Sequence, residues 1–195
     1  MQDDQAVIYG TYNRDLALTQ FQAMGGNHVR INVVHPKGGS KDTSFTNTTL
    51  LDGAVDAVVA KGLTPQLTLF WREKSPKLQA AWMKNVVAHF GDRVNRYSIS
   101  NEPDLYITED KPCTKNVIKG IEKQFKSQFV KQHGLLRAKV ITAPKGVAPK
   151  DACLRYERGV TYNNLATAAV PAIHSANPNA QNLGGETSPT TGLDW

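Results

Sequence analysis

Short runs of alternating or β-branched apolar residues recur along the chain and predict the strands of a sheet. Residues 29–34 carry four Val or Ile side chains, and residues 66–71 and 96–100 have a similar strand-like composition. Weaker strands are predicted at residues 6–9 and 181–186. The centres of the three stronger strands are 36 and 30 residues apart, about the length of one strand-and-helix unit.

Between these strands, apolar residues recur at the spacing of an amphipathic helix. Leu51, Val55, Val58 and Val59 are one such set, and it ends at Gly62. The same spacing predicts helices over residues 14–24, 78–86 and 165–176. Strands that alternate with helices favour a parallel sheet with crossover helices, so the predicted fold is of the α/β class.

The regular alternation is interrupted by residues 105–160, which we interpret as a partly helical insertion after the fourth strand. The chain has a net charge of +6, and this segment holds 12 Lys and Arg against 5 Asp and Glu. A basic segment can bind nucleic acid or another acidic polymer. A solvated helix face explains the charge more simply, and no aromatic residues are interleaved for base stacking, so no nucleic-acid partner is predicted.

Length and composition indicate one globular domain over residues 1–195, with two domains as the alternative, and 40% of the residues are hydrophobic and 21% charged. No run is apolar enough to span a membrane, and the first residues lack the pattern of a signal peptide. The two cysteines, Cys113 and Cys153, both lie in the insertion. A disulfide between them would close the insertion and imply an oxidising, extracellular location, whereas two free thiols are the alternative.

The candidate chemistry lies where the fourth strand ends, at Asn101-Glu102-Pro103. In barrels of parallel strands, active sites are built at the carboxyl ends of the strands. Glu102 is therefore a candidate general acid whose pKa would have to be raised by burial or by a second carboxylate. The alternative is an ordinary surface carboxylate in a turn.

Ser100-Asn101-Glu102-Pro103 resembles the fourth-strand motif of the cellulase-like glycoside hydrolases of clan A. Residues 25–30 resemble the approach to the second strand of that family, and residues 177–180 and 184–189 resemble its fifth-strand region. The resemblance covers most of residues 6–104 and 160–192. It implies a (β/α)8 TIM barrel that hydrolyses O-glycosidic bonds in a polysaccharide, oligosaccharide or glycoside with retention, with Glu102 as acid/base.

Several further residues are candidates for binding the sugar. Asn101 can hydrogen-bond a 2-hydroxyl, and Trp71 at a strand end can stack on a sugar face, although core packing is equally plausible for Trp71. Arg30, within its strand, needs a carboxylate partner, for which Glu102 and Glu186 are candidates, or else forms an outward salt bridge. His35 is a candidate hydrogen-bond donor or an ordinary loop histidine. The histidines show no metal-ligand spacing, so neither a metal nor a cofactor is predicted.

The resemblance also implies a nucleophilic Glu after a seventh strand, but only five strands are predicted before Trp195. A complete barrel takes about 250 residues. We therefore expect an incomplete barrel of about five strand-and-helix units whose nucleophile lies beyond this chain. The alternatives are a shortened enzyme in which Glu186 is the second carboxylate, and a non-catalytic carbohydrate-binding or relic barrel fragment. The sequence leaves the sugar, the linkage and the oligomeric state open.

Overall fold

The computed structural model describes residues 4–35, 41–46, 48–71, 73, 75–100 and 149–184, with the side chains of residues 149–161 left out. The contacts divide the chain into two compact units. The first consists of Met1–Pro103 and Asn164–Trp195 and holds the sheet, and the second is Asp104–Asn163. The predicted insertion falls mostly in the second unit and, apart from the backbone of residues 149–160, outside the described residues.

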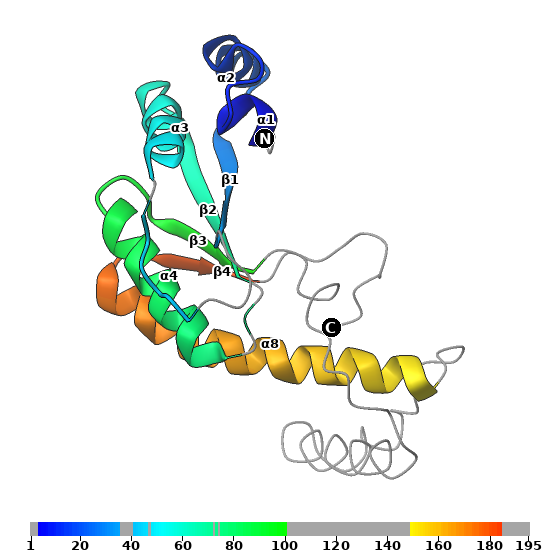
Figure 1. The fold of residues 1–195 in the computed structure, drawn as a ribbon. Helices are drawn as coiled ribbons and strands as arrows, with labels where there is room; N and C mark the ends of the chain where they lie inside the picture. The colour runs from blue at the N-terminus through cyan, green and yellow to red at the C-terminus, as the bar shows by residue number, and fades with distance from the viewer. Residues whose placement is uncertain are drawn as a thin grey trace. The chain divides into compact units, whose positions relative to one another are not determined.

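Four parallel strands form one sheet in which neighbours in sequence are neighbours in space (Figure 1). The strands are β1 (His28–Val34), β2 (Thr64–Phe70), β3 (Arg96–Ile99) and β4 (Gln181–Leu183). Helices α1 (Asp4–Val7) and α2 (Arg14–Ala23) precede β1, whereas α3 (Thr49–Ala60), α4 (Pro76–Phe90) and α8 (Pro149–Ala176) join successive strands. The predicted parallel α/β arrangement is confirmed for these four strands.

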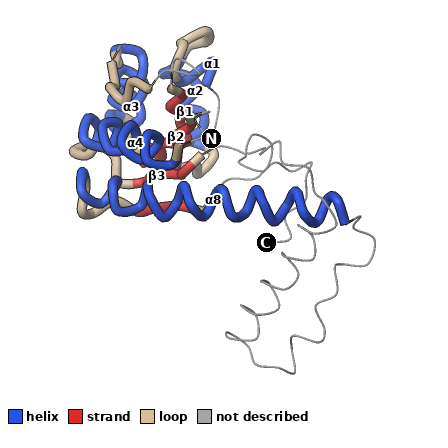
Figure 2. Tube along the Cα trace, turned by 60° about the horizontal axis from the view of Figure 1, so that its bottom comes forward, coloured by secondary structure: helices blue, strands red, loops and turns tan. Residues whose placement is uncertain are grey.

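One face of the sheet is apolar and is covered by the connecting helices (Figures 1 and 2). On β1 the odd-numbered residues Val29, Ile31 and Val33 are fully buried, and the even-numbered residues are partly or fully exposed. The helices contribute buried side chains to the same core, chiefly Val55, Val58, Trp82, Met83, Val86, Val87, Phe90, Leu165, Ala169 and Ile173. The apolar residues that recur every second position along the strands and about every 3.6 positions along the helices therefore pack in one hydrophobic layer.

Local signals set the ends of the helices. Asn13 accepts a hydrogen bond from the Leu16 backbone N–H at 2.9 Å and caps α2. Ser75 caps α4 in the same way ahead of a proline at its first residue. Gly62, with a φ of 68°, ends α3 in a conformation that side-chain-bearing residues rarely adopt.

The strand predicted at residues 6–9 is wrong, because the structure has α1 there. The amides of Ile8 and Tyr9 bond to the Asp4 carbonyl and that of Thr11 to the Gln5 carbonyl, so the segment satisfies its backbone locally. Its apolar side chains Ala6, Val7 and Ile8 are buried nonetheless. A short apolar run does not by itself distinguish a helix from a strand.

The start of β4 is fixed by Asn177, which follows α8 directly. Its buried amide donates to the carbonyl oxygens of Val94 and Gly91 and to the side chain of Asn95, at 3.1–3.3 Å. Its own oxygen accepts the Asn179 backbone N–H at 3.0 Å. One side chain therefore ties the turn after α8 to the turn before β3, next to the Gln181-to-Asn95 backbone bond.

Candidate functional site

The face of the sheet opposite the helices is polar. Strand register aligns Arg30, Gln66 and Arg96 in one row across β1, β2 and β3, and Asn32, Thr68 and Ser98 in the next row towards the carboxyl ends. We call these six residues the polar face. Thr68 and Ser98 are fully buried, and the other four are half-buried. Buried polar groups of this kind need hydrogen-bond partners, and the bonds described below supply them for Thr68 and Ser98.

The side chains of Arg30 and Gln66 lean towards the carboxyl ends of the strands. Arg30 donates from Nε to Thr68 Oγ1 at 2.9 Å and from Nη2 to Asn32 Oδ1 at 3.5 Å. Gln66 donates to Ser98 Oγ at 2.9 Å. Each acceptor belongs to the row one step nearer the carboxyl ends. The Arg30 guanidinium is therefore directed towards the carboxyl ends of the strands, where barrels of parallel strands have their active sites.

Asp4 of α1 extends this network from the free edge of β1. Its Oδ2 accepts a hydrogen bond from Asn32 Nδ2 at 2.8 Å, and its Oδ1 lies 3.5 Å from the Asn32 backbone N–H. The backbone N–H of His35 donates to the Phe70 carbonyl of β2. Backbone N–H groups of odd- and even-numbered residues point to opposite sides of a strand, so the backbone N–H of Asn32 points away from β2. The carboxylate thus occupies an edge position at which a neighbouring strand would otherwise pair.

β3 ends in a strained residue. Ser100 has a φ of 67°, and among the described residues it is the one non-glycine residue with positive φ. It is buried, and its amide bonds to the Leu69 carbonyl at 2.8 Å. Side-chain-bearing residues held in this region cluster at active sites, ligand-binding loops and switch regions. The strain lies directly before Asn101 and Glu102 in the sequence.

His35 and Trp71 lie on the other side of the sheet from Arg30. Their rings stack with centroids 3.9 Å apart and planes 12° apart, and both pack edge-on against Trp82 of α4. His35 is 8% exposed and Trp71 4% exposed. His35 Nε2 also lies 2.9 Å from the Asp42 carbonyl. The structure therefore places these two candidates together in the core beneath α4, and their role towards a sugar stays a prediction.

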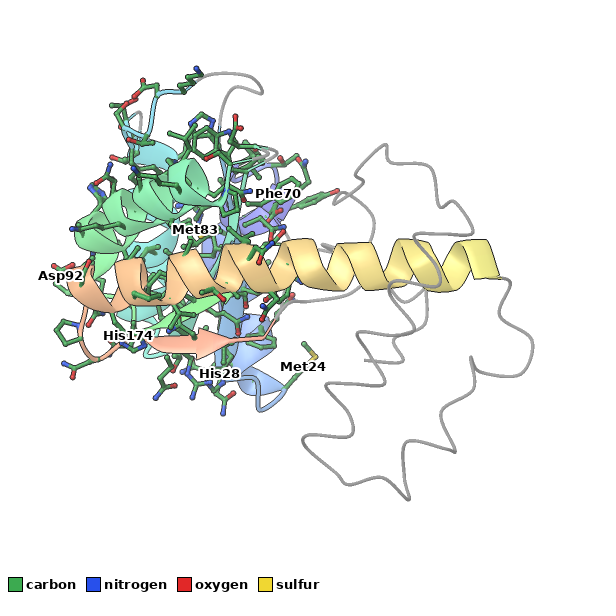
Figure 3. All side chains as sticks on the ribbon, turned by 90° about the horizontal axis from the view of Figure 1, so that it is seen from below. Met24, His28, Phe70, Met83, Asp92 and His174 are labelled. Carbon is green, nitrogen blue, oxygen red and sulfur yellow. The ribbon has the colours of Figure 1, made fainter. Side chains whose placement is uncertain are left out.

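A separate cluster of charged residues lies at the opposite end of the sheet, where the strands begin. Figure 3 shows Phe70 on the side towards which β4 points and Asp92 and His174 on the side where the strands begin. At that end Arg93 bridges the carboxylates of Asp52 and Asp56 at 2.8 and 2.7 Å. His89 also contacts Asp52 at 2.8 Å. This cluster joins α3 to the end of α4 and is structural in character.

The charge cluster shows how local partners set a pKa. Burial alone would raise the pKa of Asp52, but hydrogen bonds from Thr48, Arg93 and His89 outweigh it and lower the pKa to about 2. The hydrogen bonds that Arg93 donates to the carboxylates of Asp56 and Asp52 raise the pKa of Arg93. In the core nearby, burial raises the pKa of Tyr97 to about 12 while its hydroxyl donates to the Val94 carbonyl.

Four predicted functional residues lie outside the described residues, namely Asn101, Glu102, Glu186 and Cys113. The side chain of Cys153 is not described either, so the disulfide stays a prediction. The predicted pairing of Arg30 with Glu102 or Glu186 likewise stays a prediction. Among the described residues no three His, Cys, Asp or Glu side chains gather as a metal site, and no described helix could cross a membrane.

Sequence reasoning missed Asn32, Thr68, Ser98 and Asp4. The first three could have been found by continuing the strand alternation, because they share parity with Arg30 within their aligned strands. Asp4 carries no such signal, since its contact with Asn32 spans 28 positions and depends on α1.

No protein-family model matches the chain, and no curated protein matches it in sequence. Solved structures do match it. A family 39 glycoside hydrolase from Bacteroides cellulosilyticus WH2 superposes with a TM-score of 0.50 and 13% identity over 88% of this chain. Two structures of the β-glucosidase from Thermotoga maritima, one of them the complex with azafagomine, give a TM-score of 0.54 with 17% and 16% identity over 89% and 90% of this chain.

The chain spans 28% of the family 39 enzyme and 36–37% of the β-glucosidase. At such low identity the likeness establishes the fold alone. The neighbours are TIM-barrel glycoside hydrolases, so the four-stranded parallel sheet is consistent with part of such a barrel. The expected TIM-barrel fold class is supported to this extent.

Proposed function

We propose that this chain forms part of a (β/α)8 glycoside hydrolase of the cellulase-like type, with its sugar site at the carboxyl ends of β1–β4. The reaction is hydrolysis of an O-glycosidic bond in a polysaccharide, oligosaccharide or glycoside with retention. One observation carries the proposal. Arg30 lies on the polar face and is directed by Thr68 and Asn32 towards the strand ends, where β3 leads into Asn101 and Glu102.

Glu102 is assigned as the acid/base. It protonates the leaving oxygen in the first step and removes a proton from water in the second. Asn101 binds the 2-hydroxyl, a contact that strengthens as the transition state forms.

A retaining enzyme needs a second carboxylate about 5–5.5 Å from the first. We assign the nucleophile to a part of the barrel beyond this chain, in keeping with the share of the neighbours' length that the chain covers. Glu186 then belongs to the sugar-binding set.

The test uses the protein as its gene encodes it, with 4-nitrophenyl β-glycosides as substrates and calorimetry for affinity. Glu102→Gln should abolish turnover and keep affinity for the same glycosides. Glu73→Gln is the matched control, since this described carboxylate accepts the Ser75 backbone N–H at 3.1 Å in a loop. A wild-type protein that binds glycosides without cleaving any of them would contradict the enzyme and support the binding-module alternative.

A further inference from the structure

Two of the acceptors that hold Arg30 on the polar face differ in their distance from the guanidinium. Thr68 Oγ1 is at 2.9 Å and belongs to a fully buried residue, so it fixes the Nε end of the guanidinium. Asn32 Oδ1 is at 3.5 Å from Nη2 and lies at the limit of a hydrogen bond. The hold of Asn32 on the Nη2 group of Arg30 therefore depends on how firmly the side-chain amide of Asn32 is itself fixed.

The Asn32 amide can face Arg30 in two ways, and only one is favourable. A guanidinium has only hydrogen-bond donors, so it can bond to the Oδ1 atom of Asn32 but not to its Nδ2 group. The carboxylate of Asp4 only accepts, and it takes Nδ2 at 2.8 Å. Asp4 thus selects the amide orientation that turns Oδ1 towards Arg30 (the second contact, from the Asn32 backbone N–H to Asp4, holds the carboxylate in place).

We infer that Asp4 is a positioning residue for Arg30, acting through the amide of Asn32. The importance of this role for a sugar site rests on the proposed function. Its geometry stands without that function, as a relay from α1 through β1 to the guanidinium. Because a bond to a carboxylate is charge-assisted and stronger than one between neutral groups, replacement by a neutral acceptor should weaken the relay and removal should break it.

The test follows the Nη–H signals of Arg30, the groups that face Asn32, by ¹⁵N NMR and measures their exchange with solvent. In Asp4→Ala, exchange should rise about fivefold, the factor that corresponds to the loss of one ordinary hydrogen bond. Asp4→Asn keeps an acceptor and should give a smaller rise, which serves as rescue and as the variant to use if Asp4→Ala does not fold. Asp15→Ala, which removes an exposed carboxylate paired with Lys61, should leave the signal unchanged.

A double-substitution cycle separates positioning from general loosening of the fold. Asn32→Leu should raise exchange as Asp4→Ala does, and adding Asp4→Ala to Asn32→Leu should have no further effect. An Arg30 signal that is the same in wild type and in a folded Asp4 variant would overturn the inference, whatever the activity of the protein. A raised exchange rate in a protein that neither binds nor cleaves 4-nitrophenyl glycosides would instead sustain the positioning role and overturn the proposed function.

Discussion

The rings of His35 and Trp71 stack face to face, with centroids 3.9 Å apart, and so join the carboxyl ends of β1 and β2 on the helix side of the sheet. Both residues continue the odd-numbered parity of the buried strand positions before them. Trp82 of α4 packs against both rings. The cluster therefore anchors α4 to the sheet at the carboxyl ends of the strands, where the proposed site lies.

Trp71→Ala should lower the free energy of unfolding by about 3–5 kcal/mol, because it removes a buried indole and leaves a cavity against His35 and Trp82. Trp71→Phe should cost only about 1–2 kcal/mol. The Trp71 Nε1 atom is buried and has no hydrogen-bond partner among the described residues, so phenylalanine forfeits no such bond. Urea unfolding followed by circular dichroism measures both changes.

Tyr12→Ala is the control for this pair, since that aromatic side chain is 65% exposed and its loss should change stability by no more than about 0.5 kcal/mol. If Trp71→Ala left stability unchanged and reduced affinity for a glycoside, stacking on the sugar would be its role instead.

Asp52 should make stability depend on pH in the acid range. Its pKa is about 2 in the folded protein against an ordinary value of 3.8, so the unfolded chain binds a proton first as the pH falls. The stabilisation is therefore complete above about pH 4 and is lost as the pH falls towards 2, and it amounts to at most about 2 kcal/mol. The stability difference between wild type and Asp52→Asn, measured by urea unfolding at pH 7, 4 and 2.5, should shrink accordingly.

Asp92→Asn provides the comparison, because that carboxylate is 78% exposed and lies 3.5 Å from Arg93 Nε. It should show a small effect. A difference for Asp52→Asn that is the same at every pH would mean that its carboxylate is not held by Thr48, Arg93 and His89.

Asn177→Ala should cost about 1–3 kcal/mol, since it removes the buried amide that donates to the Val94 and Gly91 carbonyls. Asn179→Ala should be close to neutral, because Asn179 contributes its backbone N–H to the turn and is exposed. Thermal unfolding of the two variants measures the contrast, and equal midpoints would show that the Asn177 amide does not fix the start of β4.

Ser100→Gly and Ser100→Val should have opposite outcomes. Glycine adopts a φ of 67° without steric cost, so its effect on stability should stay within about 1 kcal/mol of wild type. Valine is β-branched and should lose about 2 kcal/mol or more in this conformation. Equal stabilities, measured by urea unfolding, would mean that the backbone at the end of β3 does not require the left-handed region.

Much of the fold could be predicted because the strands have a recognisable pattern of apolar residues. Val29, Ile31 and Val33 alternate with polar residues in a sheet that is buried on one face, and the helices between strands keep a regular apolar stripe. The prediction of a strand at residues 6–9 was wrong because apolar residues such as Ala6, Val7 and Ile8 can be buried in a strand or in a helix. The local hydrogen bonds to the Asp4 carbonyl favour the helix.

The candidate site was less accessible to sequence reasoning. Arg30 could be singled out as a charge within an apolar run, and the structure places it on the polar face as a group that needs partners. His35 and Trp71 were singled out by their position after strands, but position alone does not tell which face a side chain takes. Their parity with Val33 and Leu69 indicates the helix side, where the structure places them.

The most direct test of the central claim is chemical rescue of Glu102→Ala by azide, measured with a 2,4-dinitrophenyl β-glycoside on the protein as its gene encodes it. This leaving group needs no proton, so the glycosyl-enzyme still forms, and its hydrolysis should slow by about 10²- to 10⁴-fold without a general base. Azide attacks without base assistance, so added azide should restore turnover and yield a β-glycosyl azide with retained configuration. Lost turnover that azide does not restore, or unchanged turnover in Glu102→Ala, would contradict the assignment of Glu102 as the acid/base.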